Sequence, residues 1–253
     1  MRTIARLMLR DDQWAKMEPY CLGKRSDPGR SGGDNRLFVE AVLWKARTGS
    51  QWRDLPQEFG EWNTIYKRFN YWAKRGVFER MFEAVSDEPD MEYAMIDATI
   101  VPVHRHGHGA KGGLENQAIG ASKGGWTTKI LALTDALGNF VRFELLPGNR
   151  YDTVGVKPLI KGVKFKALLA DKAFDANWIV EEMDERGAEV VISQRPNRKH
   201  PRKIDDEIYK WRHLIENAFA KIKDFKGIAM RAGKTDHNFA AMLHLCMSVI
   251  NSK

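Results

Sequence analysis

The sequence predicts an α/β protein in which an all-α domain at residues 1–86 precedes a mixed β-sheet flanked by helices at residues 91–253. Two observations support this division. Up to residue 86 the apolar residues recur at helical spacing, whereas beyond it short apolar runs alternate with turn residues. The segment Ser86–Asp90, SDEPD, separates the two patterns; it is acidic and contains a proline, which is typical of a linker.

Short helices are predicted throughout the first domain. Asp11 and Asp12 are N-cap candidates for a short helix through Cys21, and Asp34 is the expected N-cap of the next helix, which ends before Gly49. A shorter helix is expected at residues 51–59, before Gly60, and a further helix at residues 63–75.

The last of these helices is amphipathic and basic. Ile65, Phe69 and Trp72 form its apolar stripe, while Lys67 and Arg68 are among the cations on its outer faces. Helix, short helix, turn and basic helix is the order found in helix-turn-helix domains, whose last helix enters the DNA major groove. We therefore expect Lys67 and Arg68 to contact DNA. A small helical bundle with a solvated basic surface is the alternative.

Beyond the linker the pattern is that of a sheet. A strand is expected at residues 93–101, and residues 127–134 and 140–146 alternate on either side of the turn DALGN, which predicts a hairpin. A short helix, a buried strand, a helix capped by Asp175 and another strand follow at residues 153–160, 166–171, 175–186 and 189–193. This order of strands and helices gives a mixed sheet covered by helices, as in RNase H-like proteins.

A glycine-rich, basic stretch at residues 104–129 joins the first two strands. It contains no phosphate-binding glycine motif. Close approach to nucleic acid, with Lys111, Lys123 and Lys129 as phosphate contacts, is the better interpretation. The alternating histidines at its start are weak candidates for metal ligands, because the glycines favour a loop.

Residues 209–223, YKWRHLIENAFAKIK, predict an amphipathic helix. On this helix Tyr209, Arg212, Glu216 and Lys223 fall within about 60° of one another, beside the apolar face. The helix can therefore pack on a core while it holds Glu216 at the rim of a cleft. An ordinary helix with a solvated polar face is the alternative.

Asp97 lies within a predicted strand and Asp171 ends another, where carboxylates are unexpected. In the predicted sheet these two strands are neighbours, and the helix at residues 209–223 can bring Glu216 to them. Two carboxylates 4 Å apart repel by about 4 kcal/mol at an effective dielectric of 20. Mg²⁺ or Mn²⁺ would remove that repulsion, and two such ions support in-line attack on a phosphodiester. Taken singly, each aspartate could instead cap a turn or a helix.

The formal net charge of +8 and the pI of about 9.4 favour a polyanionic partner. Residues 191–253 contain thirteen Lys/Arg against six Asp/Glu, and this surplus includes the candidate DNA contacts Arg195 and Arg198. No apolar run approaches the roughly 18 residues of a membrane span. Cys21 and Cys246 form no disulfide or zinc pattern, so a soluble, cytoplasmic protein is expected.

The chain resembles DDE insertion-sequence transposases of the insertion sequence 5 type. The resemblance rests on MIDATIV around Asp97, QAIGASKGGWTTKI, LLADKAFD around Asp171, and Tyr209-x2-Arg212-x3-Glu216-x6-Lys223. The last pattern matches the Tyr–Arg–Glu–Lys signature of related bacterial transposases. NRLFVEAVLWKARTGSQWRDLP and WNTIYKRFNYW resemble the family's N-terminal region.

The resemblance implies a nucleoid-associated bacterial enzyme that binds inverted terminal repeats in double-stranded DNA and acts by cleavage and strand transfer. It also implies a homodimer or larger synaptic complex in which Asp97, Asp171 and Glu216 hold two Mg²⁺ ions, replaceable by Mn²⁺. Tyr209, Arg212 and Lys223 would contact DNA near the cleaved end. A nuclease on the same fold and a non-catalytic DNA-binding regulator are the alternatives.

Overall fold

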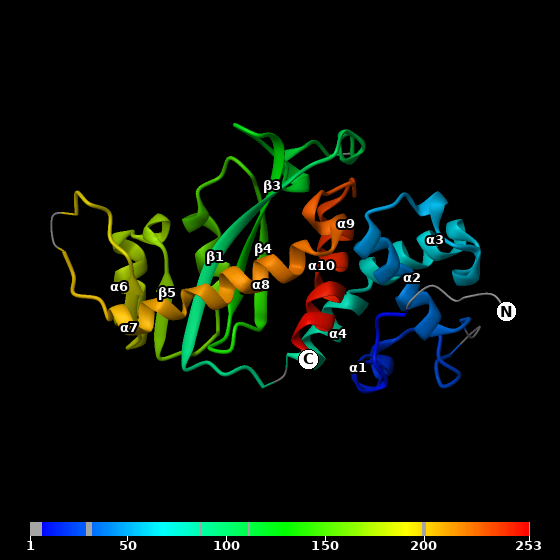
Figure 1. Ribbon diagram of the computed structural model, residues 1–253, viewed down its shortest axis with the longest axis horizontal. Helices are drawn as coiled ribbons and strands as arrows, with labels where there is room; N and C mark the ends of the chain where they lie inside the picture. Colours follow the sequence, from blue (N-terminus) through cyan, green and yellow to red (C-terminus); the bar gives the residue numbers. More distant parts are fainter. Residues whose placement is uncertain (1–6, 29–31, 87, 111, 199–200, 253) are drawn as a thin grey trace. The chain divides into compact units, whose positions relative to one another are not determined.

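The computed structural model describes residues 7–28, 32–86, 88–110, 112–198 and 201–252 (Figure 1). The chain divides into two compact units. The helical unit comprises Met1–Asp87, Pro102–Gln117 and Ile222–Lys253, and the sheet unit comprises Glu88–Val101 and Ala118–Lys221. Within the described part of the chain, no helix is both long enough and apolar enough to cross a membrane.

The helical unit contains α1 (Asp11–Met17), α2 (Asn35–Thr48), α3 (Trp62–Lys74), α4 (Val77–Val85), α9 (Lys226–Ala229) and α10 (Asp236–Asn251). Asp34 caps α2, as predicted, because its carboxylate accepts a hydrogen bond from the backbone N of Leu37 at 3.0 Å. Gly49 ends α2 with φ +69°. The predicted apolar stripe of α3 is buried.

Residues 51–59 do not form a single helix. They form the 3-10 turns Trp52–Asp54 and Gln57–Phe59, because Pro56 restricts Leu55 to an extended conformation between them. The helix α4 was not predicted. It follows α3 directly, through Gly76 with φ +64°.

The helical unit includes segments that the sequence assigned to the sheet domain. α10 packs against α2, α3 and α4. Arg231, between α9 and α10, is fully buried and donates from Nη1 to the backbone carbonyl of Gln117 at 2.7 Å. Its backbone pairs with Val103, and its guanidinium lies over the ring of Phe239. These contacts attach residues 102–117 to the C-terminal segment. The helical unit therefore extends well beyond the residues 1–86 expected for it.

The sheet unit confirms the predicted fold class. Its strands are β1 (Tyr93–Pro102), β2 (Gly120–Ser122), β3 (Gly125–Thr134), β4 (Phe140–Pro147), β5 (Ala167–Ala170) and β6 (Glu189–Ile192). Their order in the described sheet is β2-β3-β1-β5-β6, with β4 also paired to β3. β3 and β4 form the predicted antiparallel hairpin, while β1 with β5 and β5 with β6 are parallel.

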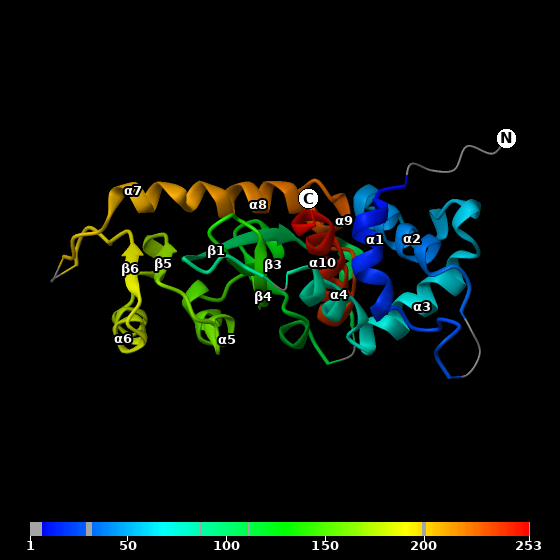
Figure 2. The same cartoon turned by 90° about the horizontal axis from the view of Figure 1, so that it is seen from below.

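Helices cover both faces of this sheet. They are α5 (Val156–Ile160), α6 (Asn177–Arg186), α7 (Asp206–Tyr209) and α8 (His213–Lys223). Figure 2 shows α5 and α6 on one side of the strands and α8 on the other. Ile96 belongs to the core cluster that includes residues of α5 and α6. Because successive residues of a strand face opposite sides, the next residue, Asp97, faces the side that α8 covers.

The structure differs from the prediction at Asp175, which is not the N-cap of α6. The N-cap is Ala176, which makes no side-chain capping bond. The carboxylate of Asp175, 1% exposed, accepts hydrogen bonds from the backbone N of Arg195 at 3.0 Å and from the guanidinium groups of Arg198 and Arg202. Charged donors stabilise a buried carboxylate more than a helix terminus would. Asp175 therefore ties the loop after β6 to the segment after β5.

Candidate active site

The parallel pairing of β1 with β5 places two predicted catalytic residues at neighbouring positions. The last paired residues are Ile96 in β1 and Ala170 in β5, and each is followed directly by an aspartate, Asp97 and Asp171. Neighbouring strands lie about 4.8 Å apart, so the backbones that carry the two carboxylates are about one strand spacing apart. Asp171 directly follows the carboxyl end of β5, where ligands bind in open α/β sheets, and Asp97 lies beside that end, midway along the longer strand β1.

A backbone N–H group holds one oxygen of each aspartate. Asp97 Oδ1 accepts from the N of Ala98 at 2.8 Å, and Asp171 Oδ1 accepts from the N of Ala173 at 2.8 Å. The second bond opens the 3-10 turn Lys172–Phe174. Both carboxylates are therefore oriented by the backbone that carries them.

Arg212 connects the third acidic residue to this pair. Its Nη2 lies 3.1 Å from Asp97 Oδ2 and 3.3 Å from Glu216 Oε1, and its Nη1 donates to the hydroxyl of Tyr209 at 3.2 Å. The predicted single helix consists of α7, the 3-10 turn Lys210–Arg212 and α8. In a 3-10 turn residues three apart eclipse each other, which places Tyr209 directly beside Arg212. The predicted polar stripe is therefore retained.

The site has an excess of negative charge around Asp97. Burial raises the pKa of Asp97 above its usual value, and the nearby Asp171 raises it further. The N–H of Ala98 and the guanidinium of Arg212 act in the opposite direction but do not cancel this effect. A cation that approaches the pair is therefore favoured, because it relieves both the desolvation and the repulsion.

The three acidic residues supply the carboxylate oxygens that Mg²⁺ and Mn²⁺ prefer as ligands. In this conformation Glu216 contacts Arg212 and remains 58% exposed. Among the described residues, no three His, Cys, Asp or Glu side chains lie close enough together to hold a metal ion. The donor set fits a divalent cation, but here a guanidinium supplies the positive charge. The structure thus brings Asp97 and Asp171 together and leaves Glu216 on the far side of Arg212.

Lys129, a predicted phosphate contact, lies inside the sheet unit. Its side chain is 9% exposed, and its ammonium lies 2.5 Å from Asp152 Oδ1. It also donates to the backbone carbonyl of Arg150 at 2.6 Å. A buried, paired ammonium is not available to a phosphate group. We therefore remove Lys129 from the candidate DNA contacts.

Arg68, a predicted contact on α3, also has a structural role. Its guanidinium stacks over the rings of Phe38 and Trp72, 4.4 and 4.9 Å from their centroids. It donates to the side-chain carbonyl of Asn35, and burial lowers its pKa. These contacts join α3 to α2. Its neighbour Lys67 is exposed and remains a candidate.

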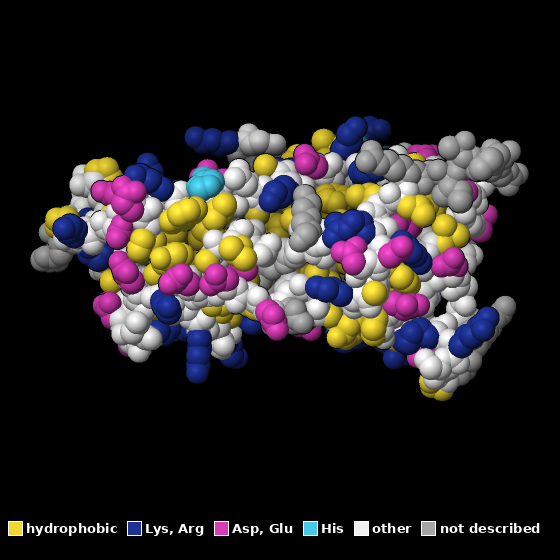
Figure 3. All heavy atoms as spheres, turned by 60° about the horizontal axis from the view of Figure 1, so that its bottom comes forward, with side chains coloured by type: hydrophobic (Ala, Val, Ile, Leu, Met, Phe, Trp, Pro, Cys, Tyr) yellow, Lys and Arg dark blue, Asp and Glu magenta, His cyan; other side chains and the backbone are white. Residues whose placement is uncertain are grey.

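The other predicted contacts differ in accessibility. Lys123 and Arg195 are exposed, and Lys223 is half-buried at the end of α8. Arg198 pairs with buried Asp175. Lys111 lies outside the described residues. On the face drawn in Figure 3, lysine and arginine side chains are interspersed with acidic ones and do not form one continuous patch.

Asp175 and Arg202 form a support of the site that was not predicted from the sequence. They hold the loop that leads into α7, and hence the segment that carries Tyr209 and Arg212. The available signal was a second aspartate four residues after Asp171, combined with several arginines in the following loop.

The chain is similar in sequence to known proteins. Residues 9–82 match the family described as "Putative transposase of IS4/5 family". An uncharacterized protein of Sinorhizobium fredii, y4sN, is 41% identical over 103 residues, which span 41% of this chain and 82% of that protein. A Brucella ovis protein described as "Putative transposase for insertion sequence element IS6501" is 34% identical over 129 residues, covering 49% of this chain and 97% of the relative.

A solved structure has a related fold. The piggyBac transposase in its synaptic complex with hairpin DNA aligns with a TM-score of 0.51 at 10% sequence identity, covering 95% of this chain and 70% of that one. Residues 88–250, which contain Asp97, Asp171 and Glu216, match the family described as "Transposase DDE domain". This match covers more than half of the sequence, and the chain therefore belongs to the DDE transposase family.

Proposed function

We propose that this DDE transposase binds the inverted terminal repeats of an insertion sequence, cleaves the DNA at its ends and joins them to target DNA by strand transfer. The observation that carries the proposal is the placement of Asp97 and Asp171 at adjacent positions of β1 and β5. The guanidinium of Arg212 contacts both Asp97 and Glu216 and so connects the third acidic residue to the pair. The similarity to the Brucella ovis protein, which is described as a putative insertion-sequence transposase, supports the same assignment.

Asp97, Asp171 and Glu216 would hold the divalent ions on which DDE transposases generally depend. We propose two Mg²⁺ ions, with Mn²⁺ as a substitute. Bound there, they would supply activation of a water or 3′-hydroxyl nucleophile and stabilisation of the leaving oxygen. The residues of the chain position the DNA. Arg212, when it leaves Asp97, can pair with a backbone phosphate while the hydroxyl of Tyr209 orients its guanidinium.

We assign the chain to the insertion sequence 5 type, with Tyr209, Arg212, Glu216 and Lys223 as its Tyr–Arg–Glu–Lys signature. Lys223 lies seven residues, or about two helical turns, beyond Glu216 in α8, so both fall on a similar side of that helix. The exposed cations Lys67 and Arg195 are proposed as further phosphate contacts. The piggyBac structure is a synaptic complex with DNA. By analogy we propose that this chain also acts as a homodimer or larger synaptic complex.

A plasmid that carries the coding sequence with its natural flanking DNA tests the proposal, because an insertion sequence includes its own ends. With Mg²⁺, the wild type should cleave at the borders of the element. Asp97→Asn, Asp171→Asn and Glu216→Gln should each abolish cleavage while binding of the same DNA, measured by gel shift, is retained. Glu181→Gln, at an exposed acid on α6, is the matched control and should cleave normally.

Full cleavage by any one of the three variants would remove that residue from the site. Supplying target DNA and free 3′-hydroxyl ends then separates the possible activities. Joined products support a transposase. Cleavage without joining would instead indicate a nuclease, and binding without cleavage a regulator.

A further inference from the structure

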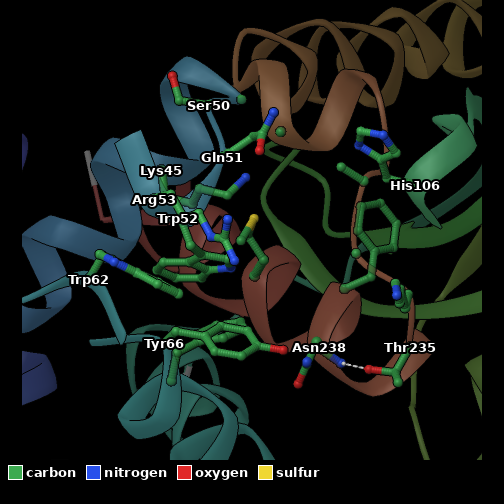
Figure 4. Close-up of a pocket in the computed structure, with 18 of the residues that line it drawn as sticks. Lys45, Ser50, Gln51, Trp52, Arg53, Trp62, Tyr66, His106, Thr235 and Asn238 are labelled. Carbon is green, nitrogen blue, oxygen red and sulfur yellow. Dashed lines mark hydrogen bonds between the residues drawn. The ribbon is translucent and has the colours of Figure 1, made fainter. Parts of the chain in front are cut away.

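The helical unit contains a cavity of about 640 Å³ that none of the candidate active-site residues lines (Figure 4). Its walls come from α2, α3, α10 and the 3-10 turn Trp52–Asp54. The volume lies within the range of about 300–1,000 Å³ typical of pockets for small organic ligands. Its lining has a distinctive chemistry, with aromatic rings on one wall and cations around them.

The aromatic wall is centred on Trp52. The ring of Trp52 lies 5.6 Å from that of Tyr66 and 5.3 Å from that of Phe69. Figure 4 shows Trp52 above Tyr66, with Trp62 on the same side of the pocket. Trp52 and Trp62 are half-buried and Tyr66 is 36% exposed, so part of their surface remains accessible. Such rings offer stacking surfaces for a planar group.

Lys45 supplies the second observation. Its side chain lines the same pocket although the residue is only 7% exposed. No ion pair joins Lys45 to a carboxylate among the residues that the structure describes, and burial alone lowers its pKa. Its ammonium lies 5.9 Å from the centroid of the Trp52 ring, at the outer limit of a cation–π contact. A buried ammonium without a counter-ion is costly, so an anion that enters the pocket is favoured.

The rest of the lining reinforces this preference. Exposed Arg53 and Lys234 border the cavity, and Arg53 lies 5.5 Å from the centroid of the Trp62 ring. Among the described residues that line the pocket, none is acidic. The pocket is thus suited to a ligand that combines a planar aromatic group with negative charge.

We propose that this pocket binds one unpaired nucleotide of a DNA strand, with its base against Trp52 and Tyr66 and a phosphate paired with Lys45. A nucleotide combines the two chemical groups that the pocket accommodates. Within a duplex the base faces are stacked on their neighbours and unavailable, so the strand must be single at this point. A nucleotide in a strand has a phosphate on each side, which matches the additional cations Arg53 and Lys234 better than a free monophosphate does. The choice of DNA rests on the proposed function.

The first experiment locates the base. A seven-nucleotide single strand that contains one 5-iodo-deoxyuridine is irradiated with the full-length protein, and the crosslinked peptides are identified by mass spectrometry. Crosslinks to Trp52 or Tyr66 support the proposal. Crosslinks found only outside the pocket overturn it.

The second experiment measures affinity by fluorescence anisotropy with the same strand, labelled and without iodine. Lys45→Met keeps most of the apolar side chain and removes the charge, so binding should weaken about tenfold. Trp52→Ala should also weaken it about tenfold or more, through loss of stacking. Lys16→Met, at an exposed cation on α1, is the matched control and should change binding less than twofold. Circular dichroism confirms that each variant is folded.

Equal affinity of Lys45→Met and Lys16→Met would overturn the proposal. So would a preference for the duplex of the same sequence, or Lys45-dependent binding of deoxyadenosine 5′-monophosphate without binding of the strand. The outcome is separate from that of the cleavage assay. If the plasmid is cleaved and the pocket does not crosslink, only this inference fails. If the pocket crosslinks and no variant of the chain cleaves, only the proposed activity fails.

Discussion

Replacing Arg212 by methionine should destabilise the sheet unit in the absence of metal. The Arg212 side chain is 15% exposed, and its Nη2 lies 3.1 Å from Asp97 Oδ2 and 3.3 Å from Glu216 Oε1. At 3.1 Å and an effective dielectric of 20, the attraction to Asp97 is about 5 kcal/mol, much of which offsets desolvation of the two groups. The variant leaves Asp97 beside Asp171 without a cation. We expect the free energy of unfolding to fall by about 2 kcal/mol.

Thermal unfolding at low ionic strength measures this change. For a chain of this size, 1 kcal/mol corresponds to about 2–4 °C, so the expected decrease in Tm is about 4–8 °C. Lys166→Met is the control. Lys166 pairs with Glu92 at 3.4 Å on the surface of the sheet unit, and both side chains are at least half exposed. Its loss should cost less than about 1 kcal/mol, because both partners remain hydrated.

Mn²⁺ should restore the lost stability of the Arg212→Met variant. A cation bound by Asp97 and Asp171 replaces the charge of the guanidinium, and a ligand that binds only the folded state stabilises it by mass action. The wild type should gain less, because Arg212 must first leave Asp97. Equal Tm values for wild type and variant without metal, or an equal gain from Mn²⁺, would refute this reasoning.

Three further changes have defined outcomes. Lys223→Ala should weaken DNA binding and reduce the slope of the logarithm of the binding constant against the logarithm of the salt concentration by about one. Lys16→Ala is the control, and an unchanged slope for Lys223→Ala would exclude a phosphate contact. Burial lowers the pKa of His244 to about 4, so as pH falls the unfolded chain binds a proton before the folded protein does. The free energy of unfolding should therefore fall between about pH 6.5 and about pH 4, by at most about 3 kcal/mol. Chemical denaturation across this range should show a smaller fall for His244→Leu. Asp175→Asn removes the charge of a buried ion-paired carboxylate and should reduce the free energy of unfolding by about 3 kcal/mol, whereas Asp184→Asn, at an exposed acid, should change it little.

The fold class and the adjacency of Asp97 and Asp171 could be predicted because local patterns determine them. Each aspartate interrupts or ends an apolar run, and each run is short enough to be a buried strand. In a parallel pair both strands run in the same direction, so an aspartate that directly follows the paired apolar run of each strand falls at the same level of the sheet. No knowledge of side-chain packing is needed for that step.

The DNA contacts were less predictable because a sequence shows a charge but not its partner. Lys129 lies in β3, which has neighbouring strands on both sides, and its charge is neutralised by Asp152 more than 20 residues away. Arg68 occupies the outer side of a helical pattern, yet it is covered by aromatic rings of α2 and α3. For Lys129, the available signal of such a partner was its position directly before the apolar run Ile130–Leu133.

The extent of the helical unit depends on contacts between residues distant in sequence. The apolar pattern of α10 indicates that the helix is buried, but it does not indicate against which helices. Arg231 bonds to Gln117, more than 100 residues earlier, and no local pattern marks either residue. The family matches at residues 9–82 and 88–250 are defined by sequence similarity, whereas the two compact units are defined by contacts in the folded chain, so their boundaries differ.

Arg212 explains why the three predicted acidic residues are not gathered in this structure. Carboxylates cannot converge without a counter-ion, and a guanidinium is both larger than a metal ion and directional in its hydrogen bonds. Paired with Asp97 and Glu216 at once, it neutralises the repulsion but keeps Glu216 away from the aspartates. The same group is also suited to a phosphate. DNA that withdraws Arg212 from Asp97 would therefore increase the affinity of the carboxylates for a cation, and by linkage the cation would favour the DNA-bound state.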